Sequence, residues 1–335
     1  MPGLSTIELD ALFAPIAAAR HVALAVSGGP DSMALMLLAA QWARGQDAAP
    51  AISVYSVDHG LRANAADEAA MVMREAGRMG LAGRVLTWEG PKPEAGIQAA
   101  ARAARYRLIA DAMREDGAEI VLTAHHLRDQ AETVLMRMAH GSGIEGLRGM
   151  DRFATIEGCR VFRPLLEVDP VLLAEVVAEA GIAPANDPSN QDTHYERVRW
   201  RQIAPALADL GLDAARLGRF ATRMADADAL IEADAERAVG AIVHREDGGA
   251  WLLRAGLANL PRVVGVRVLA KVLAAIGGER KPHALGAIER LLVRLEGPNA
   301  RPATTLHGCI VASDGVTIRV KPEGARRPSA ALISG

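Results

Sequence analysis

A short polar stretch of the chain, SGGPDS at residues 27–32, combines residue types that hold phosphate groups. It lies between two apolar runs, so we expect it to join a strand to a helix. Glycines permit close backbone approach, and the free amides and dipole of a helix start favour an anion. We therefore predict a phosphate site made by Ser27, Gly28, Gly29, Pro30, Asp31 and Ser32. The alternative is a plain turn in which Ser27 or Asp31 caps the helix. The stretch fits neither a GxxxxGKS/T loop nor a GxGxxG loop.

A second stretch, HHLRDQAET at residues 125–133, carries two histidines and two carboxylates. Asp129 and Glu132 are three residues apart, so they share a face of the helix that we expect to begin there. His125 precedes Asp129 by four residues and could hydrogen-bond the phosphate group of a ligand. An exposed acidic pair that complements the helix dipole is the alternative. No third histidine or cysteine lies at zinc-ligand spacing from His125 and His126, which disfavours a zinc site.

Arginine supplies almost all of the positive charge of this chain, because lysine occurs only at positions 92, 271, 281 and 321. The net charge is −2, so any polyanion site must be a local arginine patch. A guanidinium binds phosphate oxygens in pairs, so such a patch could hold phosphate groups. Aromatic content of 3% argues against a base-stacking platform. The two cysteines, Cys159 and Cys309, exclude a disulfide framework and a cysteine zinc site.

The elements that position these residues alternate between strands and helices in the first half of the chain. Apolar runs predict strands at 21–26, 52–57, 84–88 and 119–123. Helical periodicity predicts helices at 32–43, 67–79 and 97–114. This order indicates an α/β fold with a Rossmann-like, doubly wound parallel sheet, in which ligands bind beyond the carboxyl ends of the strands.

The second half of the chain changes character. Residues 212–244, 263–276 and 284–295 have helical periodicity, and 304–320 alternates as a hairpin that turns at Asp314 and Gly315. We therefore predict a catalytic domain at 1–208, a mainly helical domain at 209–325 that ends in a β-hairpin, and a frayed tail at 326–335. The absence of a long apolar run and of a basic leader predicts a cytoplasmic protein without membrane contact.

Five motifs in order carry a family resemblance. They are SGGPDS, VDHGLR at 57–62, AHHLRDQAETVLMRMAHGSGIEGLRGM at 124–150, RPLLEV at 163–168 and NDPSN at 186–190. SGGPDS resembles the loop of PP-loop ATP pyrophosphatases, and together the motifs resemble the tRNA(Ile)-lysidine synthetase family. The resemblance implies ATP and Mg²⁺ as cofactors, with tRNA(Ile) bearing a CAU anticodon and free L-lysine as substrates. ATP would adenylate C2 of the wobble cytidine, and the lysine amine would then displace AMP.

The resemblance also implies roles for individual residues. Asp31 and Asp129 would hold the metal, and the catalytic residues would be Asp31, Arg105, Asp129 and Glu132. ATP would bind the SGGPDS loop with His125, Arg197 and Arg201. The family usually has asparagine where this chain has Val198, which weakens the match of the ERVRWR cluster. The glycine-rich stretch 141–150 would be a hinge near the substrate entrance.

For the second domain, the resemblance implies tRNA selection. Possible phosphate contacts are Arg216, Arg219 and Arg223. A homodimer is left open.

Three other functions compete with this interpretation. A tRNA thiolase of the same fold is disfavoured because the two cysteines stand alone. A ligase acting on a small metabolite fits SGGPDS but fits VDHGLR and HHLRDQAET poorly. A non-catalytic nucleotide sensor or tRNA-binding scaffold would have no reason to keep acidic groups in both motifs.

Overall fold

The computed structural model describes residues 6–61, 64–93, 95–185, 192, 194, 196–278, 285–297 and 303–323. It contains two compact units. The first comprises Met1–Ala139 and Gly149–Ala221, and the second comprises His140–Arg148 and Thr222–Gly335. The NDPSN motif, Arg62 of VDHGLR and the predicted tail at 326–335 lie outside the described residues.

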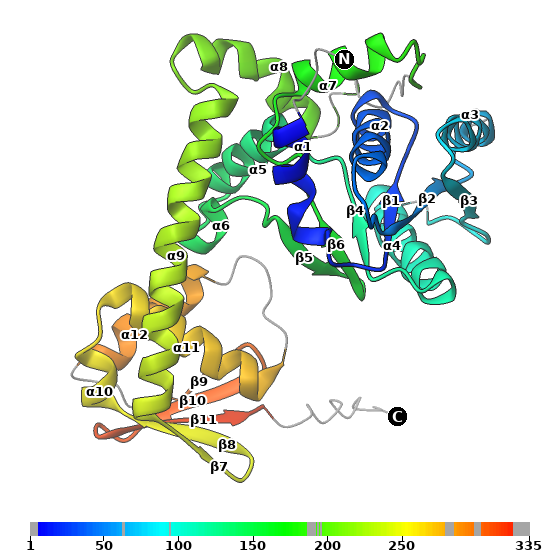
Figure 1. The fold of residues 1–335 in the computed structure, drawn as a ribbon. Coiled ribbons are helices and arrows are strands. Elements are labelled where there is room, and N and C mark those ends of the chain that lie inside the picture. The colour runs from blue at the N-terminus through cyan, green and yellow to red at the C-terminus, as the bar shows by residue number, and fades with distance from the viewer. Residues whose placement is uncertain are drawn as a thin grey trace, which may run out of the picture. The chain divides into compact units, whose positions relative to one another are not determined.

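A six-stranded sheet organises the first unit (Figure 1). Its order is β3-β2-β1-β4-β6-β5, and all neighbours run parallel except β5 and β6, which form an antiparallel pair. The strands are β1 (His21–Ala25), β2 (Ala51–Asp58), β3 (Ala82–Thr87), β4 (Ile120–Leu122), β5 (Phe153–Ile156) and β6 (Cys159–Phe162). The predicted doubly wound parallel sheet is therefore confirmed, with the β5–β6 hairpin as an addition that apolar periodicity did not indicate.

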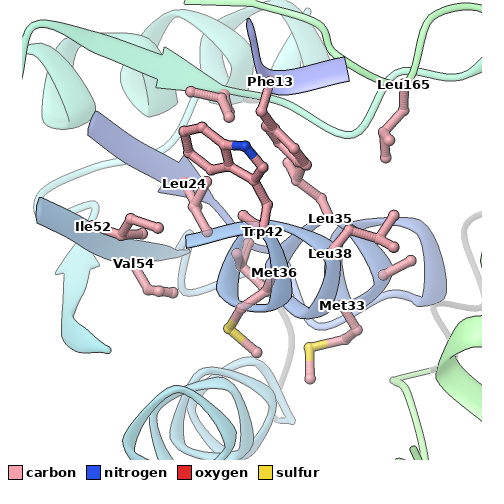
Figure 2. Close-up of a cluster of buried hydrophobic side chains, with 14 of the residues drawn as sticks. Phe13, Leu24, Met33, Leu35, Met36, Leu38, Trp42, Ile52, Val54 and Leu165 are labelled. Carbon is pink, nitrogen blue, oxygen red and sulfur yellow. The ribbon is translucent and has the colours of Figure 1, made fainter. Parts of the chain in front are cut away.

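Helices cover both faces of this sheet. The helices that lie wholly within this unit are α1 (Thr6–Phe13), the 3₁₀ turn η1 (Ala14–Ile16), α2 (Pro30–Arg44), α3 (Ala65–Arg78), α4 (Ile97–Asp116), α5 (Leu127–Ala139), α7 (Pro170–Glu179) and α8 (Glu196–Asp209). Side chains of a strand alternate between faces, so Val22 and Leu24 join the core with α1, α2 and α7, whereas Ala23 joins the core with α4. In the first core, Trp42 of α2 stacks on Phe13 at 5.1 Å between ring centroids (Figure 2). This packing fixes the last turn of α2 against the end of α1.

The second unit combines helices with an antiparallel sheet of order β7-β8-β11-β10-β9. Its elements are α6 (Ile144–Leu147), the last part of α9 (Ala214–Ile242), α10 (Arg254–Ala258), α11 (Arg262–Gly277), α12 (Leu285–Glu296), β7 (Val243–Glu246), β8 (Gly249–Leu253), β9 (Thr304–Leu306), β10 (Cys309–Ser313) and β11 (Thr317–Pro322). The predicted turn at Asp314 and Gly315 joins β10 to β11.

The C-terminal hairpin expected from the sequence is thus one part of a larger sheet. A second turn at His307 and Gly308 separates β9 from β10, and β8 pairs with β11 from a distant part of the chain. At the end of α11, a Cβ on Gly277 would stand 1.9 Å from the His307 carbonyl oxygen, so this helix can meet the turn only through glycine. The β7–β8 pair was not predicted, because β7 directly follows the long helical pattern of α9.

Candidate active site

The SGGPDS loop forms the turn from β1 into α2. Gly28 has a φ of +88°, a conformation that favours glycine, and its carbonyl oxygen accepts a 2.9 Å hydrogen bond from the Ala185 amide. The Ser32 hydroxyl donates to the Gly29 carbonyl at 2.9 Å and accepts from the Ser27 amide at 3.2 Å. Gly29 is the N-cap of α2 and no side chain caps the helix. The alternative in which Ser27 or Asp31 caps this helix is therefore wrong, and the loop leaves its amides uncapped by side chains, as a phosphate site requires.

His126 brings together the two carboxylates that were predicted to hold the metal. Its Nε2 lies 3.4 Å from Asp31 Oδ2 and 3.5 Å from Asp129 Oδ2, although these residues come from α2 and α5. His126 is only 5% exposed. Burial lowers its pKa, but the hydrogen bond to Asp31 and the charges of Asp129, Asp31 and Glu132 outweigh burial and raise the pKa above its ordinary value. The HHLRDQAET motif includes both His126 and Asp129, three residues apart. From the sequence, however, we expected His125 to be the histidine of the site.

Two arginines of α8 neutralise the buried Glu132. Arg201 Nε donates to Glu132 Oε1 at 2.6 Å, and Arg197 Nε lies 3.7 Å from Glu132 Oε2. Arg201 Nη2 also lies 3.4 Å from Asp129 Oδ1. The structure therefore joins Asp129, Glu132, Arg197 and Arg201 in one network. In the sequence, Val198 lies between Arg197 and Arg201, at the position where the family usually has asparagine. In the structure its side chain is buried.

His125 faces a different environment from its neighbour. Its Nδ1 lies 2.9 Å from the Thr123 hydroxyl. Burial is the largest cause that lowers its pKa, Asp129 opposes the shift, and the charges of Arg163, Arg197 and Arg102 add to it, so that the pKa lies at about 4. The imidazole is therefore neutral at physiological pH and can exchange hydrogen bonds with a ligand without adding positive charge.

Arg105 is the predicted catalytic residue that the structure places apart from this network. It is an exposed residue of α4, and its Nη2 lies 3.4 Å from Nε2 of His59, just beyond the end of β2. The structure records no contact between Arg105 and Asp31, Asp129 or Glu132. Arg105 and His59 therefore belong to the β2 side of the carboxyl edge of the sheet, whereas the acidic residues lie at β1 and β4.

The donor set of the site limits the metal that it can hold. Among the described residues, no three His, Cys, Asp or Glu side chains gather as a metal-binding group. Asp31 and Asp129 nevertheless place two carboxylate oxygens within 3.5 Å of one nitrogen atom. One or two carboxylates completed by substrate phosphates are the usual protein ligands of Mg²⁺. The residues therefore fit a magnesium ion that arrives with a nucleotide.

Comparisons with known proteins show the family to which this chain belongs. The model of the PP-loop domain family matches residues 4–207. The tRNA(Ile)-lysidine synthase of Bradyrhizobium diazoefficiens is 42% identical over 352 residues, which cover 97% of this chain and 96% of that protein. The corresponding protein of Methylobacterium nodulans is 44% identical over 328 residues, which cover 96% and 95%. This chain belongs to the tRNA(Ile)-lysidine synthase family. The family resemblance of the five sequence motifs is thereby confirmed.

The fold of this family member also resembles a solved tRNA-modifying enzyme. The U34-tRNA thiolase NcsA from Methanococcus maripaludis, solved with its 4Fe–4S cluster, matches with a TM-score of 0.56 and 14% identity, covering 65% of this chain and 77% of that chain. At this identity the likeness shows the fold alone. No helix among the described residues is both long and apolar enough to cross a bilayer.

The glycine-rich stretch 141–150 of this family member was predicted to be a hinge, and most of it is tied into the second unit. Arg148 Nη1 lies 3.3 Å from Asp228 Oδ2, and Arg267 Nη2 lies 2.5 Å from Asp228 Oδ1 and 3.6 Å from Glu145 Oε2. A Cβ on Gly143 would stand 2.4 Å from Leu285 Cδ2. These ion pairs reach α9 and α11 from the segment that follows α5.

Proposed function

We propose that this chain is a tRNA(Ile)-lysidine synthase that uses ATP to attach free lysine to the wobble cytidine of a CAU anticodon. One observation carries the proposal: relatives of this name match the chain over nearly its whole length, and the chain keeps the acidic residues of both motifs in one cluster beside the start of α2. The PP-loop domain supports the use of ATP. The cytoplasm is the compartment in which we expect this reaction, and a homodimer stays a prediction.

In the first step, the residues around α2 would orient ATP for transfer of its adenylyl group to cytidine O2. The uncapped amides of the SGGPDS loop would bind the leaving pyrophosphate. Magnesium, held by Asp31 and Asp129 together with the phosphates, would neutralise charge that builds on the phosphate oxygens. His126 would hold both carboxylates in position through its Nε2. Arg105 would contribute from the β2 side together with His59.

In the second step, the lysine amine would attack C2 of the adenylated cytidine and displace AMP. The amine must be neutral to attack, and the neutral His125 beside Thr123 would contribute hydrogen bonding and no charge. Glu132 would act chiefly as the anchor of Arg201 and Arg197, because its carboxylate is already occupied by both guanidinium groups. We therefore propose a positioning role for Glu132 and a contact with ligand for Arg197 and Arg201.

Sulfur transfer is the competing reaction on this fold, and the cysteines argue against it. Cys159 is buried in β6, donates a hydrogen bond to the Tyr106 carbonyl oxygen, and has a pKa raised to about 11, chiefly by burial. Cys309 is buried in the other unit, where burial raises its pKa. Buried thiols of raised pKa are poor nucleophiles and poor cluster ligands.

The test is incorporation of radiolabelled lysine into an unmodified tRNA(Ile) transcript with a CAU anticodon, in the presence of ATP and magnesium. A transcript that lacks the wobble cytidine is the control. We expect label in the first transcript only. Release of pyrophosphate on tRNA addition without label would contradict lysidine synthesis while keeping the PP-loop chemistry.

The variant Asp31→Ala separates the adenylation site from tRNA binding. We expect loss of tRNA-dependent pyrophosphate release, because the metal site loses one of its two carboxylates, and nearly unchanged tRNA affinity in a filter-binding assay. Wild-type pyrophosphate release by this variant would remove the SGGPDS loop from the adenylation site.

A further inference from the structure

One buried arginine of the first unit lies at the ligand edge of the sheet without an acidic partner. Arg163 directly follows β6, and the neighbouring Phe162 carbonyl oxygen accepts a 3.0 Å hydrogen bond from the amide of Thr123, the residue that contacts His125. Arg163 is only 4% exposed. Arg163 is the first residue of the RPLLEV motif, and the sequence indicated no role for its side chain.

The hydrogen bonds of Arg163 leave one edge of its guanidinium group unused. Nη1 donates to the Asp151 carbonyl oxygen at 2.5 Å, and the backbone amide donates to the Arg152 carbonyl oxygen at 2.9 Å. Nε is buried and has no hydrogen-bond acceptor. Among the described residues, no carboxylate lies within ion-pair distance of Arg163, and Nη2 has no recorded acceptor. A buried guanidinium edge without an acceptor is costly, so we expect a ligand to supply one.

The charges around Arg163 indicate that this ligand is an anion. Burial is the largest cause that lowers the pKa of Arg163; Tyr106 and Asp151 raise it, whereas the positive charges of Arg102 and Arg137 lower it, and the net shift is downwards. Arg102 lies over the Tyr106 ring at 5.1 Å, and Arg137 Nη1 donates to the Gly149 carbonyl oxygen at 2.5 Å. An excess of positive charge at a buried position favours a small carboxylate or phosphate group.

The position of Arg163 in the sheet indicates which anionic group of the substrates could bind it. Residue 163 follows β6 and the SGGPDS loop follows β1, with β4 between the two strands. Two strand spacings separate the positions by about 10 Å. The ATP phosphates belong at the loop, so a second anion belongs at Arg163. A lysine bound here by its carboxylate could extend its amine, on a four-carbon stem, towards the reacting cytidine. A tRNA phosphate is less suited to a side chain that is 4% exposed.

We propose that Arg163 binds the α-carboxylate of the lysine substrate through its Nε–Nη2 edge. The proposal rests on the proposed function, because it assigns the site of the second substrate. A bidentate pair between a guanidinium and a carboxylate has this geometry. Arg163 thereby selects an amino acid over a plain amine.

The experiment compares lysine with lysinamide, which keeps both amines and lacks the carboxylate, in the wild type, in Arg163→Gln and in Arg163→Lys. The control variant is Arg160→Gln, which changes an exposed arginine of β6, three residues before Arg163. Transfer from adenylated tRNA is followed by mass spectrometry, and tRNA-dependent pyrophosphate release without lysine measures the first step.

We expect Arg163→Gln to lower kcat/KM for lysine by about 10- to 100-fold, with lysinamide and the first step unchanged. Arg163→Lys keeps the charge without the planar fork and should show a smaller loss for lysine alone, so it keeps the test decisive if the glutamine variant fails to fold. An equal loss with both amines would make Arg163 structural and overturn the proposal. Weaker tRNA binding with an unchanged lysine dependence would also overturn it, in favour of a tRNA phosphate. Wild-type protein that transfers no lysine would overturn the proposed function as well.

Discussion

The ion pair between Arg201 and Glu132 gives the sharpest prediction about the energetics of the site. The Glu132 side chain is 3% exposed, and Arg201 donates to both of its oxygens, at 2.6 Å and 3.4 Å. Arg201→Met keeps the aliphatic length and removes the charge. The buried carboxylate would then retain only the 3.7 Å pair with Arg197.

The size of the effect follows from that burial. Removing one partner of a buried ion pair costs about 3–5 kcal/mol, because the remaining charge has lost its solvent and its partner. Arg197 keeps part of the compensation and the Arg201 side chain is 36% exposed, so we expect Arg201→Met to lower the free energy of unfolding by less, about 2 kcal/mol. Glu132→Gln in the same background removes the stranded charge and should recover most of this loss.

Urea unfolding followed by tryptophan fluorescence measures both variants. Trp42, Trp88 and Trp200 belong to the first unit and Trp251 to the second, so the signal reports mainly on the unit that contains the ion pair. Arg199→Met, at an exposed position of the same helix, is the control and should change stability by less than about 0.5 kcal/mol. A loss for Arg201→Met as small as that of the control, or no recovery in the double variant, would refute the reasoning.

Three further predictions concern separate features. NMR titration should give His125 a pKa near 4. Between about pH 6.5 and pH 4 only the unfolded state binds the proton, so the stability of the wild type relative to His125→Asn should fall as the pH drops through this range. A pKa near 6.5 would contradict this. Gly28→Ala should raise the KM for ATP, because φ is +88° there and a Cβ would stand 3.3 Å from Met71 Cε, and an unchanged KM would show that the loop tolerates the change. Charge reversal of Arg219 and Arg223 together should weaken tRNA binding but leave ATP binding intact, because both arginines are exposed on α9 and form no ion pair with the residues that the structure describes. Arg216 is left unchanged because its Nη1 already lies 3.0 Å from Asp213 Oδ2. Equal weakening by Arg237→Glu, on the same helix, would reduce that result to net charge.

The sequence alone determined the local framework of the first unit. Apolar runs and helical periods predicted β1 to β4 and the helices between them, because burial on a sheet or on one helix face imposes those periods on residue type. Ordered motifs identified the family, and they pointed to Asp31, Asp129 and Glu132 as members of one site.

Only the tertiary structure decided which side chains meet. Periodicity records that a residue is buried but not its partner, so the sequence could not show that Asp31 and Asp129 share His126 or that Arg201 neutralises Glu132. The sequence also did not indicate a ligand site at Arg163, because residue type alone does not show whether an arginine is solvated or buried without a hydrogen-bond acceptor. The strand order β2-β1-β4-β6 set these contacts, since it chose which carboxyl ends of strands are neighbours and left Arg105 beside His59.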